Sequence, residues 1–158
     1  MTTNTEFKDG DLIVTRIYHA SIKEVFGAWI ETSKIKQWWG CAECTDVRSE
    51  VEPEVGGKYS HHMTLDTPHG VHDAPGHATL IEFDPPNRLA YTSTDDNDKM
   101  VVTVTFTEVE NGTLVRLVHS NIPDMKVEGD IEMRQIIREG WTAAFGKLAP
   151  VVEGEQAA

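Results

Sequence analysis

The residues with the clearest capacity for chemistry are two cysteines and a group of histidines. Cys41 and Cys44 are separated by two residues, which is the spacing of half a zinc site or of a redox pair. Histidines that could supply the missing zinc ligands are His61, His62, His69, His72 and His77. Their spacing contains no second clean pair, and no βαβ pattern of the thioredoxin type surrounds the cysteines. We therefore expect loop cysteines and no metal or cofactor, with a zinc or redox site as the alternative.

Two histidines lie on segments that we expect to face an apolar interior. His61 shares one face of an alternating segment with Tyr59 and Met63, and His119 lies on a later strand-like segment. An imidazole in an apolar cavity can donate or accept a hydrogen bond, and it can also act as an acid or base. We expect both histidines to orient a ligand, and the alternatives are satisfied core residues or acid–base catalysts. Because no recognisable nucleophile motif adjoins a histidine, we favour binding over catalysis.

Aromatic residues form the other candidate set: Trp29, Trp38, Trp39, Tyr59, Tyr91, Trp141 and Phe145. Aromatic walls with one polar edge suit flat apolar ligands, because the rings supply contact area while a hydroxyl or indole N–H orients the guest. Ordinary core packing is the alternative for each of them. Trp38 and Trp39 are expected to be structural or to form a lid at the mouth of a cavity.

A short acidic turn holds Asp95, Asp96 and Asp98. It lacks the glycine at the sixth position and the glutamate at the twelfth position that an EF-hand calcium loop requires. We expect a solvated hairpin tip.

The elements that must position these residues are mostly strands. Alternating or β-branched segments predict strands at residues 12–18, 47–51, 59–65, 77–83, 88–94, 102–106 and 114–120. Asn111-Gly112 supplies a hairpin turn before the last of them. The first ten residues and residues 153–158 are expected to be frayed ends.

Three helices are expected. Ser21 and Glu24 form a capping box before a short helix, and Thr32 or Ser33 can cap a second one that Gly40 ends. From about residue 130 the apolar spacing becomes helical for about 20 residues, and Pro150 should end this helix. Its broad apolar face needs a large partner surface. We therefore predict an α+β fold in which an antiparallel sheet of about seven strands curls around the long C-terminal helix.

The composition limits the class of protein. A chain of 158 residues with 39% hydrophobic residues fits one domain with a full core. Its net charge of −12 argues against nucleic acids and anionic membrane surfaces as partners. No apolar run approaches the roughly 20 residues that span a bilayer. The first ten residues are polar, without the apolar segment of a signal peptide, which favours a cytoplasmic protein.

Several short motifs occur in an order that resembles one family. They are Ala28-Trp29, Gln37-Trp38-Trp39-Gly40, Gly56-Gly57-Lys58-Tyr59, Asp84-Pro85-Pro86-Asn87-Arg88-Leu89, Val102-Thr103-Val104-Thr105-Phe106, Gly112-Thr113 to His119-Ser120, and Gly140-Trp141. Each motif is weak alone, but together they cover residues 12–149. The chain is similar to the activator of heat-shock-protein-90 ATPase type of SRPBCC domain. The family tends to have proline where this chain has Cys41, so the cysteines are a departure from its pattern.

The resemblance implies the helix-grip, or START-like, fold, with two short helices after the first strand. It implies one domain over residues 1–158 with its core at about 12–149. It also implies a cavity between the sheet and the last helix, where relatives bind hydrophobic small molecules. The residues expected to bind a hydrophobic or aromatic ligand there are Trp29, Tyr59, His61, Met63, Tyr91, His119, Ile137, Trp141 and Phe145.

Two other functions remain open under this resemblance. One is a co-chaperone-type interaction module for a heat-shock-protein-90 homologue. The other is a histidine-assisted cyclase or hydrolase that acts on an aromatic or polyketide-like substrate. Fold-level similarity does not choose among them, and it is compatible with a monomer or a homodimer.

Overall fold

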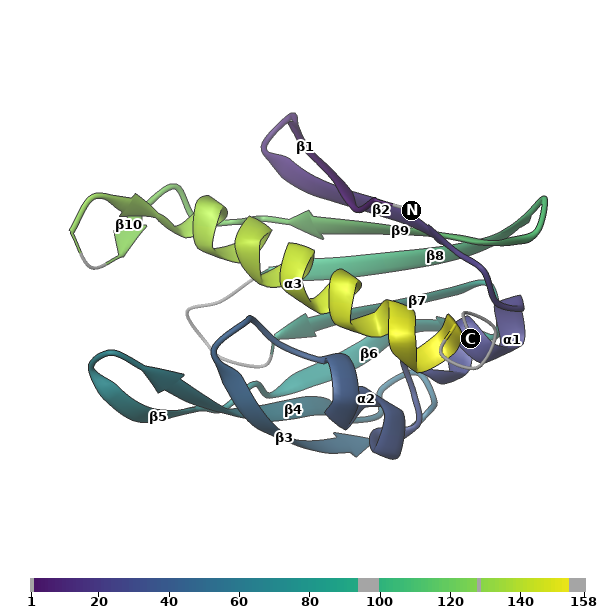
Figure 1. Cartoon of the computed structure of the whole chain (residues 1–158), viewed down its shortest axis with the longest axis horizontal. Helices are drawn as coiled ribbons and strands as arrows, with labels where there is room; N and C mark the ends of the chain where they lie inside the picture. The colour runs from purple at the N-terminus through teal and green to yellow at the C-terminus, as the bar shows by residue number, and fades with distance from the viewer. Residues whose placement is uncertain (1, 94–99, 128, 154–158) are drawn as a thin grey trace.

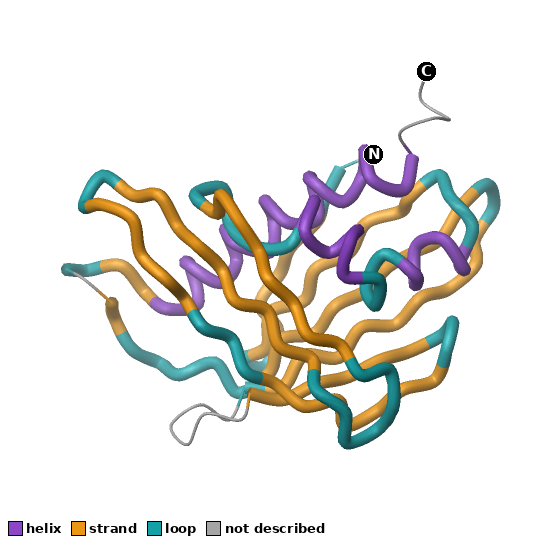
Figure 2. The backbone as a smooth tube through the Cα atoms, turned by 90° about the horizontal axis from the view of Figure 1, so that it is seen from below, coloured by secondary structure: helices purple, strands orange, loops and turns teal. Residues whose placement is uncertain are grey.

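The computed structural model describes residues 2–93, 100–127 and 129–153. An antiparallel sheet curls around one long helix, α3 (Met133–Glu153), which crosses its concave face (Figures 1 and 2). This confirms the predicted α+β helix-grip architecture. The acidic turn of Asp95, Asp96 and Asp98 lies outside the described residues.

The larger part of the sheet has six strands in the order β1-β2-β9-β8-β7-β6. Their bounds are β1 Asn4–Lys8, β2 Asp11–Tyr18, β6 Ala78–Asp84, β7 Arg88–Ser93, β8 Val101–Val109 and β9 Gly112–Ser120. All neighbours pair antiparallel, so the alternating apolar side chains of successive strands collect on one face. That face packs against α3.

The smaller part has three strands in the order β3-β4-β5, with bounds β3 Cys44–Val51, β4 Tyr59–Thr67 and β5 Gly70–Ala74. It is joined to the larger part by backbone hydrogen bonds between residues 56–61 and residues 76–80. The amide of His61 donates to the carbonyl of Gly76 at 2.9 Å, and the amide of Leu80 donates to the carbonyl of Gly57 at 2.9 Å. The two parts therefore form one continuous curved surface.

Two short helices follow β2: α1 (Ile22–Gly27) lies near the C-terminal end of α3, and α2 (Thr32–Trp38) lies beside α3 over β3 (Figure 1). Helix α1 begins at Ser21, whose hydroxyl accepts a hydrogen bond from the amide of Glu24, as the capping box predicts. Helix α2 is followed by Gly40, whose φ of 93° redirects the chain toward β3. A small hairpin of β10 (Lys126–Val127) and β11 (Ile131–Glu132) leads into α3.

Contrary to the prediction of a frayed end, residues 4–8 form β1, which pairs with β2 from Asn4 to Lys8. Helix α3 holds this strand in place. Arg138 Nε donates a hydrogen bond to Thr5 Oγ1 at 2.9 Å, and the guanidinium of Arg138 lies 5.6 Å from the centre of the Phe7 ring. Such long-range contacts leave no signal in the local pattern of polar and apolar residues.

Three local predictions were also wrong. No strand was predicted between residues 65 and 77, yet residues 70–74 form β5, which is almost wholly exposed and therefore lacks an apolar alternation. Pro150 lies inside α3 and does not end it. It is exposed in the last turn, where one missing amide leaves the preceding turns intact. Helix α2 has Glu31 at its N-cap, without a side-chain hydrogen bond, so neither Thr32 nor Ser33 caps it.

Candidate functional site

Two adjacent cavities lie at the concave side of the sheet. The strand-side cavity has a volume of about 280 Å³ and is lined by Trp39, Tyr59, His61, Met63, Pro75, Gly76, His77, Ala78, Tyr91, Met100, Val102 and His119. The helix-side cavity has a volume of about 340 Å³ and is lined by Trp39, Gly40, Cys41, Met63, Leu65, His119, Ile136, Ile137, Gly140, Trp141 and Ala144. Trp39, Met63 and His119 belong to both linings, so they form the wall between the cavities.

His61 is held in the strand-side cavity by contacts on several sides. Its Nδ1 atom lies 2.8 Å from the hydroxyl of Ser49, which stands opposite it on β3. The ring centre lies 3.9 Å from that of Trp39 and 4.4 Å from that of Tyr59. Burial lowers the pKa of His61 to about 3, because the charged form would lose its hydration. The imidazole is therefore neutral near pH 7.

His119 connects the sheet to the helix. Its Nδ1 atom accepts a hydrogen bond from the indole N–H of Trp141 at 2.9 Å, and its Nε2 atom lies 3.1 Å from the sulfur of Met100. Because an indole nitrogen can only donate, Nδ1 is unprotonated and Nε2 carries the proton of the neutral ring. Burial lowers the pKa of His119 to about 4, so this ring is also neutral near pH 7.

The predicted site residues divide into two groups. Those that line a cavity are Tyr59, His61, Met63, Tyr91, His119, Ile137 and Trp141. Trp29 and Phe145 line neither cavity and are fully buried behind the wall. The carbonyl of Trp29 accepts a 2.6 Å hydrogen bond from the Tyr59 hydroxyl, and its ring centre lies 6.2 Å from that of Trp141. These two residues support the lining from behind.

Trp39 is the main residue that sequence reasoning misplaced. We expected it to be structural or part of a lid, but it stands between the two cavities. The turn at Gly40 sets its direction, because a residue with a φ of 93° swings the chain away from α2. Trp38 is indeed structural: it is fully buried, and its indole N–H donates to the carbonyl of Ala28 at 2.9 Å. Met100 also lines the strand-side cavity, although it was not among the predicted site residues.

The Cys-x-x-Cys segment forms a turn at the rim of the helix-side cavity. Both thiols are free, and burial raises the pKa of Cys41 and of Cys44 above the ordinary thiol value. Lys147 Nζ donates hydrogen bonds to the carbonyls of Trp39 at 3.3 Å and Cys41 at 3.2 Å, which ties the turn to α3. Across residues 2–93, 100–127 and 129–153, no group of three or more His, Cys, Asp or Glu residues could hold a metal ion.

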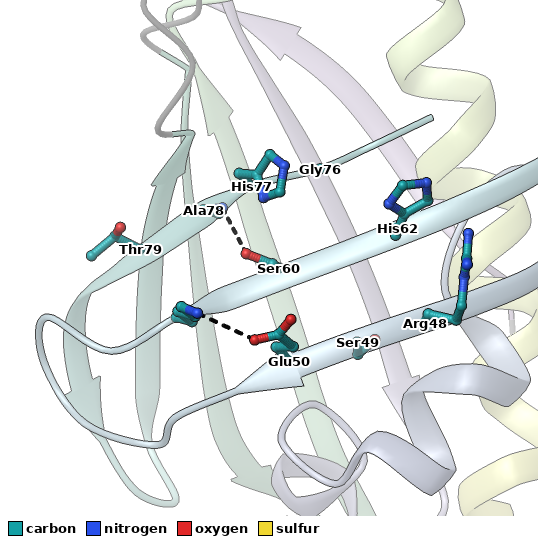
Figure 3. Close-up of a pocket in the computed structure, with 10 residues that line it drawn as sticks. Arg48, Ser49, Glu50, Ser60, His62, Gly76, His77, Ala78 and Thr79 are labelled. Atoms are coloured by element: carbon teal, nitrogen blue, oxygen red, sulfur yellow. Dashed lines mark hydrogen bonds and ion pairs between the residues drawn. The ribbon is translucent and has the colours of Figure 1, made fainter. Parts of the chain in front are cut away.

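A third cleft, of about 550 Å³, is lined by residues of β3 and β4, among them Glu50 and His62, and by residues 76–79 (Figure 3). Some of its polar groups pair with one another or with the backbone, whereas the Nε2 atom of His62 is buried and has no hydrogen-bond partner among the described residues. Lys58 Nζ lies 3.3 Å from Glu50 Oε2, and the hydroxyl of Ser60 accepts a hydrogen bond from the amide of Ala78 at 3.4 Å. The cleft shares Gly76, His77 and Ala78 with the lining of the strand-side cavity, so the two adjoin each other at these residues.

A curled antiparallel sheet, a long C-terminal helix across it and cavities between the two define a helix-grip, or START-like, protein. The family described as activator of Hsp90 ATPase homolog 1-like protein matches residues 19–153, and the chain belongs to this family. No curated protein matches the chain. None of the helices in the described residues combines the length and hydrophobicity that a bilayer crossing requires.

Solved structures show the same fold. Protein CV1439 from Chromobacterium violaceum is similar with a TM-score of 0.78 and 22% identity, over 90% of this chain and 97% of that chain. A protein from Rhodobacter sphaeroides is similar with a TM-score of 0.76 and 18% identity, over 98% of this chain and 99% of that chain. CalU16 from Micromonospora echinospora is similar with a TM-score of 0.62 and 17% identity, over 97% of this chain and 83% of that chain.

Proposed function

We propose that the protein binds a small, mainly apolar molecule with an aromatic ring system in the two cavities. The observation that carries this proposal is the shared wall of Trp39, Met63 and His119, which makes the cavities neighbours on one interior surface. Cavities of about 280 and 340 Å³ are, taken together, in the range of small-molecule sites. Met63 has a flexible side chain, so this wall can adapt to a guest.

The chemistry of the lining favours such a ligand. Rings of Trp39, Tyr59 and Tyr91 lie within 6.3 Å of one another, centre to centre, at the strand-side cavity. Tilted and edge-on rings of this kind offer contact to another aromatic ring. The two histidines supply the polar points that orient a guest.

Catalysis by these histidines is disfavoured near pH 7. A general base works best when its pKa is near the working pH. Burial instead lowers the pKa of His61 to about 3 and that of His119 to about 4. Both rings are therefore weak bases in this structure, and we propose binding without a chemical step.

The test uses N-phenyl-1-naphthylamine, a neutral probe whose fluorescence rises in apolar surroundings. The informative variant is Gly140→Leu, because a Cβ at Gly140 would lie 3.9 Å from Cys41 Cβ, an ordinary contact, so a side chain can enter the helix-side cavity. The matched control is Gly146→Leu, one and two-thirds turns further along α3, where a Cβ would meet nothing within 4 Å. Gly146 is exposed.

We expect the native protein and Gly146→Leu to bind the probe with a rise in thermal midpoint, and Gly140→Leu to bind it at least several-fold more weakly. No binding by the native protein, or equal binding by both variants, would contradict the proposal. The family's description names activation of the Hsp90 ATPase. Association with an Hsp90 homologue by a protein that does not bind the probe would instead favour the co-chaperone function.

A further inference from the structure

His61 has a ring nitrogen that the folded chain leaves without a partner. Its Nε2 atom is shielded from solvent and makes no hydrogen bond among the described residues, although Nδ1 lies 2.8 Å from Ser49 Oγ. Buried polar atoms are nearly always paired, because an unpaired one has lost its hydrogen bonds to water. His61 lines the strand-side cavity, so a molecule that binds there and displaces the atoms covering Nε2 can supply the missing partner.

The position of this nitrogen is well defined. The residue is only 3% exposed, and the rings of Trp39 and Tyr59 pack against the imidazole with centre distances of 3.9 and 4.4 Å. Ser49 fixes the opposite edge of the ring. A group held on several sides loses little conformational freedom when it forms a further hydrogen bond, so it discriminates well between ligands.

The surroundings favour an uncharged partner. Among the described residues that line the two cavities, none is Lys, Arg, Asp or Glu. His61 and His119 are neutral near pH 7, and the chain carries a net charge of −12, which repels anions at longer range. A carboxylate or ammonium group in these cavities would lose its hydration without gaining a counter-charge.

The hydrogen-bonding character of Nε2 depends on Ser49. If the serine hydroxyl donates to Nδ1, then Nε2 carries the proton and donates; if the hydroxyl accepts from Nδ1, then Nε2 accepts. A ligand hydroxyl can do both, so it satisfies either tautomer of His61. A carbonyl oxygen or an ether oxygen can only accept, and it satisfies one tautomer.

We propose that His61, backed by Ser49, determines the specificity of the site, and that the ligand is an uncharged aromatic molecule whose hydroxyl group pairs with Nε2 of His61. A phenol is the simplest member of this class. This inference rests on the proposed binding function and adds the chemical class of the ligand and the residue that selects it.

The test compares three probes with the same two-ring system: naphthalene, 1-naphthol and 1-naphthoate. For the native protein near pH 7 we expect 1-naphthol to bind about tenfold more tightly than naphthalene, which is the factor that one hydrogen bond to a buried group contributes. We expect 1-naphthoate to bind more weakly than naphthalene, because its charge must be desolvated. Dissociation constants come from quenching of tryptophan fluorescence.

Two phenylalanine variants on β4 separate His61 from its neighbour. His61→Phe keeps a buried ring but removes Nε2, and it should bind 1-naphthol and naphthalene with equal affinity. His62→Phe is the matched control, because adjacent residues of a strand face opposite sides and His62 lines the outer cleft. It should keep the tenfold preference. Ser49→Ala should reduce the preference without abolishing naphthalene binding.

The outcomes distinguish the two proposals. If the native protein binds neither naphthalene nor 1-naphthol, the proposed function fails together with this inference. If it binds both equally, or if His61→Phe keeps the preference, only the inference fails. Should His61→Phe not fold, the ¹⁵N chemical shift of His61 Nε2 in the native protein decides. This chemical shift must change when 1-naphthol is added and must not change when naphthalene is added. The opposite result would overturn the inference.

Discussion

The indole N–H of Trp141 donates a 2.9 Å hydrogen bond to Nδ1 of His119, and this contact joins the middle of the sheet to the long helix across the helix-side cavity. The surrounding contacts of α3 are mainly apolar, and apolar packing alone is non-directional. A directed hydrogen bond instead fixes how α3 is rotated about its axis. It thereby keeps Ile137 and Gly140, which line the same cavity, turned toward it.

This contact can be measured with a double-mutant cycle. Trp141→Phe removes the donor and leaves Nδ1 of His119 unpaired, while His119→Leu removes the acceptor. We expect each single variant to lose about 1–3 kcal/mol of unfolding free energy, because a buried group is left unpaired or a cavity forms. The double variant should lose about 1 kcal/mol less than the sum of the two. Urea unfolding measures all four proteins, and strict additivity would show that the two residues are not coupled.

Stability should depend on pH through His61. Its pKa is lowered to about 3 in the folded protein and is about 6.5 in the unfolded chain, so the unfolded state binds more protons between these values. The stability that the neutral ring contributes is therefore complete above pH 6.5 and is lost as the pH falls toward 3. At pH 5 the loss of unfolding free energy amounts to about 2 kcal/mol.

The groups around His61 do not obscure this dependence. Ser49 does not titrate, and the pKa of Tyr59 and that of Tyr91 are raised by burial, far from the window of interest. His119 titrates in the same direction and is present in both proteins to be compared. Urea unfolding at pH 7 and pH 5 should show a smaller loss for His61→Phe than for the native protein. His69→Gln, an exposed control, should match the native loss.

Two glycines should respond to alanine with opposite signs. At Gly112 a Cβ would lie 2.2 Å from the carbonyl oxygen of Tyr18, so the backbone of β9 or β2 must shift. Gly112→Ala should cost about 1–3 kcal/mol. At Gly146, an exposed position on α3, a Cβ would meet nothing, so Gly146→Ala should stabilise by about 0.5–1 kcal/mol. Thermal unfolding tests both, and the same sign for the two would contradict the structure.

The alkylation rates of Cys41 and Cys44 can report whether the helix-side cavity is occupied. Because burial raises the pKa of Cys41 and of Cys44, both thiols should react with iodoacetamide more slowly than free cysteine at pH 7.5. N-phenyl-1-naphthylamine should slow the reaction of Cys41, which lines the cavity, more than that of Cys44. Peptide mass spectrometry distinguishes the two sites. Equal protection of both, or none, would argue against a probe in this cavity.

Sequence reasoning was most successful where the pattern and the burial coincide. The apolar spacing through Ile137, Trp141 and Phe145 predicts α3, and the alternation through Tyr59, His61 and Met63 predicts β4, because each element buries one face. It failed for β1 and β5, which both pair with an adjacent strand of the chain, and β5 is so exposed that it has no apolar alternation. The pairing of β1 with β2 is short-range in sequence, but what keeps β1 in place is its contact with α3.

For the candidate site, the inward-facing residues of the strands could be predicted from the sequence, but the position of Trp39 between the two cavities could not. Alternation places His61 on the inner face of β4, but no local pattern brings Trp39 beside it at 3.9 Å. That contact needs the turn at Gly40 and the anchoring of the following segment by Lys147, which is more than a hundred residues away. Likewise, Trp29 and Phe145 are aromatic residues of the right region, and only packing reveals that they lie behind the lining.

The junction between β4 and β6 has a consequence for hydrogen exchange. The amides of His61 and Leu80 form two of the backbone hydrogen bonds that join the two parts of the sheet, and His61 lines the strand-side cavity beside this seam. If the seam parts, both amides become accessible to deuterium together, and the cavity opens at the same moment. Their shared exchange rate therefore reports how often the interior opens. A bound guest that bridges the seam should slow the exchange of both amides by the same factor.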